Sequence, residues 1–76
     1  MNERDLESTD WVELDLALLR SIEARGLLMP LDVTRDGRVI HGKRRLKCCR
    51  TLGITEIPVR ILDLTPQQIE EHMLLA

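Results

Sequence analysis

Aromatic side chains are almost missing from this chain of 76 residues: Trp11 is present, and there is no Phe or Tyr. The core must therefore be aliphatic, and each such side chain contributes about 1.5–3 kcal/mol when it is fully buried. The length allows a single domain, near the lower limit for a chain that folds by itself. The apolar fraction of 43% is ordinary for a globular protein, so we expect a folded domain with a small core.

The sequence also has few features of membrane, exported or metal-binding proteins. No apolar run approaches the ~20 residues of a membrane span, and the first ten residues are polar and acidic, unlike a secretory signal. Cys48 and Cys49 are adjacent and would point about 100° apart on a helix, which prevents a disulfide between them. His41 and His72 stand alone, without zinc-ligand spacing. We expect a cytoplasmic protein with reduced, packed cysteines, no metal site and no membrane contact.

The first half of the chain predicts a helix followed by two strands. Residues 1–10 are polar and are expected to be a loose segment. Helical spacing of leucines predicts a helix over 11–25, with Asp10 as its cap and Gly26 after its end. Asp36-Gly37 supplies the positive φ angles of a tight turn between strands at 31–34 and 38–40.

The second half adds a helix, a strand and a last helix. Residues 43–52 have helical composition between Gly42 and Gly53, and residues 57–62 read as a strand. Thr65-Pro66-Gln67-Gln68 is a capping box that starts the last helix, and no C-cap signal precedes Ala76, as in a domain cut short at its C-terminal end. The expected fold is α+β, one domain over 11–76 with a small mixed sheet of about three to four strands covered by helices.

Residues 41–50, HGKRRLKCCR, hold five cations in a chain whose net charge is −2. On a helical wheel the apolar side chains Leu46, Cys48, Cys49 and Leu52 share one face. Three cations, Lys43, Lys47 and Arg50, fall on the opposite face. Arg45 projects along the apolar face within the first turn, where a guanidinium either lies along the core or meets an anion.

The start of this helix has the features of a phosphate site. Free N–H groups and the helix dipole attract anions there, and Gly42 would let a ligand approach closely. Two simpler readings stay open: Lys47 and Arg50 as a solvated face, and the cysteines as small core residues.

The ordered set of motifs resembles the N-terminal domain of the ParB family, which shares its fold with sulfiredoxin. The matching positions are Ser21-Ile22, Gly26, Pro30, Val33, Gly42, Arg44, Arg45, Leu52-Gly53 and Pro58-Val59. The resemblance implies binding of a nucleoside triphosphate, CTP, with Mg²⁺. It implies that the segment from Gly26 to Pro30 lines the nucleotide pocket, and that Gly42, Lys43, Arg44 and Arg45 hold the phosphates.

The chain departs from the family pattern at two points. Lys43 stands where the family has Glu, and the sequence stops at EHMLLA, where a motif with metal-contacting groups would begin. Sulfiredoxin places its reactive cysteine at the position of Lys43, which argues against redox chemistry here.

Three functions follow as hypotheses. The first is a nucleotide- or phosphate-binding module of a DNA-partition or regulatory protein, with Arg44 and Arg45 as the groups that hold the anion. The second is a nucleic-acid-contacting adaptor that uses Lys43, Lys47 and Arg50. The third is an enzyme of the same fold, a nucleoside triphosphatase, nuclease or phosphotransferase, although the sequence shows no catalytic set.

Overall fold

A computed structural model describes residues 1–75 as one α+β unit, which confirms the expected fold class. The helical elements are η1 (Glu3–Asp5), a 3₁₀ turn, and the α-helices α1 (Leu16–Arg25), α2 (Lys43–Thr51) and α3 (Pro66–Leu75). The strands are β1 (Leu31–Val33), β2 (Val39–His41) and β3 (Val59–Ile61).

The three strands form one mixed sheet in the order β2-β1-β3. β1 pairs antiparallel with β2 through a tight turn, and parallel with β3 after the long crossover through α2. The turn lies where it was predicted, but only Gly37 takes a positive φ, of 91°, and Asp36 does not. The amide of Gly37 donates to the carbonyl of Thr34 over 3.0 Å and closes the turn.

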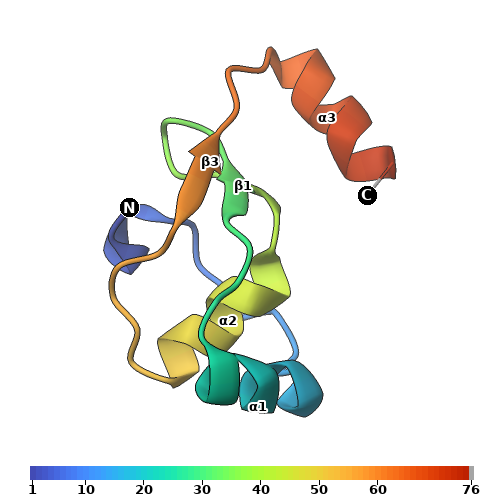
Figure 1. The fold of residues 1–76 in the computed structure, drawn as a ribbon. Helices are drawn as coiled ribbons and strands as arrows, with labels where there is room; N and C mark the ends of the chain where they lie inside the picture. The colour runs from blue at the N-terminus through green and yellow to red at the C-terminus, as the bar shows by residue number, and fades with distance from the viewer. Residues whose placement is uncertain (76) are drawn as a thin grey trace.

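The core lies between the sheet and the paired helices α1 and α2, which pack side by side in the lower half of Figure 1. The fully buried side chains include three from the apolar face of α2 that the wheel predicted, and the others come from β1, β2 and the loop before β3. They are Leu46, Cys48 and Cys49 of α2, with Leu31, Val33, Val39 and Ile57. Both cysteines are free as well as buried, so the prediction of reduced, packed cysteines is confirmed.

Helix α1 begins five residues later than the leucine spacing predicted. Its N-cap is Asp15, whose Oδ1 accepts a hydrogen bond from the Leu18 amide over 3.1 Å. The prediction of Asp10 as the cap is wrong, because the chain makes a turn there in which the Val12 amide donates to the Thr9 carbonyl over 2.9 Å. Two aspartates with similar capping potential stand five positions apart, and burial of Val12 in that turn favours the second.

The first ten residues are held against the body of the domain, contrary to the expected loose segment. The Met1 amino group donates to the Ile57 carbonyl over 2.9 Å, and the Glu3 amide donates to the Thr55 carbonyl over 2.7 Å. Leu6 is buried in the core. Polar composition concealed this packing, because most of the contacts are made by backbone groups.

Helix α3 begins at the predicted capping box and projects to one side of the sheet in Figure 1. The Gln68 amide donates to Thr65 Oγ1 over 3.2 Å, and the Thr65 amide donates to Gln68 Oε1 over 2.9 Å. Its contact with β2 includes the rings of His41 and His72, whose centroids are 6.0 Å apart. Among residues 1–75, no helix is both long and apolar enough to cross a membrane.

Candidate functional site

Gly42 joins β2 to α2 in a conformation that other residues rarely adopt. It is the N-cap of α2, with φ 109° and ψ 20°, and no side chain caps the helix. A Cβ at this position would lie 2.8 Å from Cγ of Leu31, a fully buried side chain of β1. Glycine is therefore required at this position because the turn packs closely on β1. This reason is separate from the room for a ligand that the sequence suggested.

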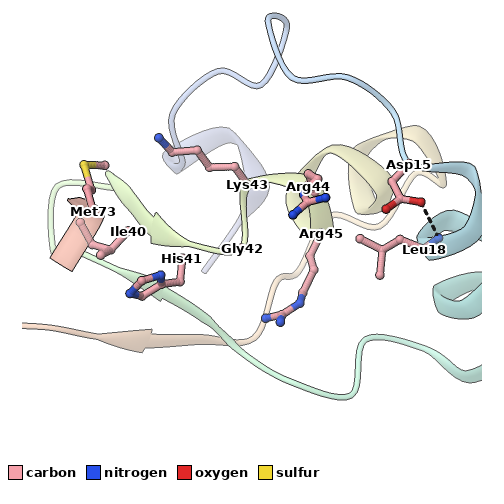
Figure 2. A pocket seen from close by; sticks show the side chains of 9 residues that line it. All are labelled: Asp15, Leu18, Ile40, His41, Gly42, Lys43, Arg44, Arg45 and Met73. Atoms are coloured by element: carbon pink, nitrogen blue, oxygen red, sulfur yellow. Dashed lines mark hydrogen bonds between the residues drawn. The ribbon is translucent and has the colours of Figure 1, made fainter. Parts of the chain in front are cut away.

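A cleft of about 620 Å³ opens beside this turn. It is bounded by the start of α1, the end of β2, the first turn of α2 and one side chain of α3, all drawn in Figure 2. The lining residues are Asp15, Leu18, Ile40, His41, Gly42, Lys43, Arg44, Arg45 and Met73. Four of the six residues predicted to bind nucleotide are thus brought together in one cleft: Gly42, Lys43, Arg44 and Arg45.

The guanidinium groups of Arg44 and Arg45 carry the positive charge of the cleft. Figure 2 shows both side chains leaving the first turn of α2, Arg44 beside Asp15 and Arg45 on a different side of the helix. The ion pairs found among residues 1–75 use Arg35, Arg50 and Arg60, and neither cleft arginine belongs to them. The two cleft guanidinium groups therefore keep their hydrogen-bond donors available for an anion.

Lys43 lines the cleft but directs its ammonium elsewhere. Its Nζ lies 5.1 Å from the centroid of the Trp11 ring, and Figure 2 shows the side chain extending away from the Arg45 guanidinium. No local pattern in the sequence indicates this contact, because Trp11 lies in a turn whose path depends on the packing of the first ten residues.

Asp15 also lines the cleft, which was not predicted from the sequence. Its carboxylate caps α1 through one oxygen and is the acidic group of the cleft lining. The sequence does contain a signal for Asp15, since an aspartate just before the leucine-rich helix can cap it. That signal was overlooked because Asp10 was predicted to be the cap.

The other two cations of the basic stretch, Lys47 and Arg50, do not line the cleft. The solvated-face interpretation is nevertheless wrong for Arg50, which is half-buried and pairs with Glu3 over 2.8 Å. Lys47 is also half-buried and does not line the cleft.

Gly26 and Pro30 are exposed and do not line this cleft. Gly26 ends α1 with a φ of 78°, and the segment 26–30 leads directly into Leu31, the side chain that lies under Gly42. Their part in nucleotide binding stays a prediction of the family resemblance.

The two thiols behave as core groups. Burial raises the pKa of Cys48 and, with the neighbouring thiol, raises the pKa of Cys49. A raised pKa keeps a thiol protonated and unreactive near neutral pH. Cys48 Sγ donates to the Asp15 carbonyl over 3.6 Å and so ties α2 to the start of α1.

A small α+β domain with an arginine-lined cleft at a strand–glycine–helix junction is the class that these observations define. A profile of the ParB N-terminal domain matches residues 4–76. The chain belongs to the ParB N-terminal domain family.

Curated relatives support this assignment. The chain is 42% identical over 55 residues to a probable plasmid-partitioning protein ParB of Thermus thermophilus, covering 68% of this chain and 18% of the relative. It is 38% identical over 61 residues to a chromosome-partitioning protein ParB of Myxococcus xanthus, covering 76% and 21%. A probable chromosome-partitioning protein ParB of Rickettsia felis is 36% identical over 58 residues, covering 76% and 20%. The chain spans about a fifth of the length of these relatives.

Proposed function

We propose that this domain binds the phosphate groups of a nucleoside triphosphate at the first turn of α2, within a DNA-partition protein. One observation carries the proposal: Arg44 and Arg45, without acidic partners among residues 1–75, share a cleft with the free amides of that turn. A guanidinium can meet a phosphate through two parallel hydrogen bonds, and helix N-terminal amides add more donors.

CTP with Mg²⁺ is the ligand that the family resemblance implies, and the cleft residues fit it. The volume of about 620 Å³ lies within the range of roughly 300–1,000 Å³ that is usual for small-molecule sites. Mg²⁺ is commonly bound through one or two carboxylates together with substrate phosphates. Asp15 would supply the protein carboxylate here, through the oxygen that does not cap α1.

The role in DNA partition is proposed from the relatives, which are named as plasmid- or chromosome-partitioning proteins. The adaptor hypothesis required Lys43, Lys47 and Arg50 as free cations. Arg50 is engaged by Glu3 and by carbonyls of the first ten residues, which weakens that hypothesis.

The function proposed here is binding, and hydrolysis is not part of it. Among residues 1–75, no group of three or more His, Cys, Asp or Glu side chains is placed to hold a metal ion. Any metal would therefore depend on oxygen atoms of the ligand, together with Asp15.

The test is a titration of the domain with each of the four nucleoside triphosphates, with and without Mg²⁺, followed by backbone amide NMR. We expect saturable shifts of the amides from 42 to 46, largest with CTP. Amides of α3 beyond Met73 serve as the internal reference. Shifts scattered over all exposed basic residues, or none at saturating concentration, would refute a defined phosphate site.

A further inference from the structure

Lys43 and Trp11 form a contact at the rim of the cleft that no element of the proposed phosphate site explains. The Lys43 Nζ lies 5.1 Å from the ring centroid, within the usual range for a cation–π interaction. Trp11 is 69% exposed, although it is the only Trp and neither Phe nor Tyr is present. None of the ion pairs among residues 1–75 includes Lys43, so the Trp11 ring is the partner of this cation.

The contact with Trp11 affects the cleft because Lys43 is itself a cleft residue. Lys43 is the first residue of α2 and lines the same cleft as Arg44 and Arg45. A cation in the first turn opposes the helix dipole, so the ammonium is favoured wherever it finds negative charge density. In the structure that density is the face of the Trp11 ring, and the ammonium extends away from the Arg45 guanidinium.

The relative strength of two interactions decides what happens when a phosphate arrives. An exposed cation–π contact shifts an equilibrium by only about two- to fivefold. A charge-assisted hydrogen bond to phosphate is worth roughly ten- to a hundredfold. A phosphate within reach of Lys43 therefore outcompetes the Trp11 ring.

We propose that Trp11 is a specificity-determining residue of the anion site. Its ring keeps the Lys43 ammonium away from the arginines until a polyphosphate binds and contacts Lys43. Orthophosphate is bound by Arg44 and Arg45 and leaves Lys43 on the ring. A chain of two or three phosphates extends beyond the arginines and takes Lys43 as its third cation. This assignment rests on the proposed function and specifies the ligand class of the same cleft.

The test is calorimetric titration with inorganic tripolyphosphate and with orthophosphate. Trp11→Leu should tighten tripolyphosphate binding about two- to fivefold and leave orthophosphate unchanged, because Lys43 no longer has to leave the ring. Lys43→Met should weaken tripolyphosphate by about two- to fiftyfold, which is the factor for the phosphate contact divided by the factor for the ring contact. The double variant should bind like Lys43→Met alone, and Lys47→Met, on the same helix outside the cleft, is the matched control.

A second readout follows Lys43 itself. Its ε-methylene group is bonded to the Nζ that lies 5.1 Å from the ring centroid, so its protons should carry a ring-current shift. This shift should disappear on addition of tripolyphosphate and persist with orthophosphate. Since Trp11 is exposed and loses only its contact with Lys43, Trp11→Leu should change the unfolding equilibrium in urea by no more than about two- to fivefold. A small change of this size separates a binding effect from misfolding.

Two results would overturn the assignment. One is an effect of Trp11→Leu that persists in the Lys43→Met background, and the other is equal Lys43 dependence for both anions. Failure of the wild-type domain to bind either anion would instead remove the proposed phosphate site, and this assignment with it.

Discussion

Arg50 Nε donates a hydrogen bond to Glu3 Oε2 over 2.8 Å and joins the last turn of α2 to the 3₁₀ turn at the start of the chain. Its Nη1 donates to the Glu7 carbonyl over 2.7 Å and to Thr9 Oγ1 over 3.0 Å. Its Nη2 donates to the carbonyls of Glu3 and Leu6 over 2.7 and 3.0 Å. A guanidinium has five N–H donors, and all five of them are used here to order the first ten residues.

Arg50→Ala should therefore lower the free energy of unfolding much more than the loss of an exposed surface charge would. We expect a loss of about 2–4 kcal/mol in the free energy of unfolding, because several charge-assisted hydrogen bonds disappear and carbonyls are left without donors. Urea denaturation measures this loss. Arg20→Ala is the matched control, since Arg20 is exposed on α1, and it should change stability by less than about 0.5 kcal/mol.

Arg50→Lys should recover little of that stability, because an ammonium cannot reproduce the planar fork of donors. A lysine variant as stable as the wild type would show that charge alone holds the first ten residues in place.

Gly42→Ala should destabilise the fold by about 2–4 kcal/mol, from the positive φ and from overpacking against Leu31. A side chain at Gly42 should therefore affect folding as well as the room for a ligand, because the Cβ would meet a buried side chain. Gly53→Ala is the control: its φ of 76° is also positive, but a Cβ there meets nothing within 4 Å. It should cost only about 1–2 kcal/mol, and thermal unfolding of both variants should show Gly42→Ala as the less stable one.

The buried thiols should make stability depend on alkaline pH. Because burial raises the pKa of Cys48 and Cys49, the unfolded chain releases these protons first as pH rises past about 9. Their contribution is fully present below the ordinary thiol pKa and declines as pH rises toward the folded values. The free energy of unfolding of the wild type should fall more steeply between about pH 8 and about pH 10 than that of Cys48→Ala/Cys49→Ala. Parallel pH profiles would contradict this prediction.

Much of the fold was predictable because its signals are local. The capping box at Thr65, the glycine after α1 and the apolar face of α2 each depend on residues within one or two turns. The basic first turn of α2 was predictable for the same reason, since a helical wheel and a preceding glycine define it.

The errors involve contacts between residues distant in the sequence. Arg50 looked exposed on the wheel, but its partners lie more than 40 positions earlier and are mostly carbonyl oxygens, which composition does not reveal. The positions of Asp15 and Trp11 near the cleft were not predicted for a related reason. The path of residues 9–15 depends on the same packing of the first ten residues.

In the proposed site Arg44 and Arg45 hold the phosphates of a nucleotide. Calorimetric titration of CTP with Mg²⁺ into Arg44→Ala, Arg45→Ala, Lys47→Ala and Arg20→Ala, each at low and high salt, is the most direct test of this role. Arg50→Ala is unsuitable as a comparison, because that arginine supports the fold.

Removal of either cleft arginine should lower affinity roughly ten- to a hundredfold at both salt concentrations, since a charge-assisted contact is worth about 1.5–3 kcal/mol. Lys47→Ala and Arg20→Ala should change affinity by less than about threefold at low salt, and this small effect should vanish at high salt. Equal losses for all four variants, fading together with salt, would contradict a defined phosphate site and indicate a diffuse electrostatic surface.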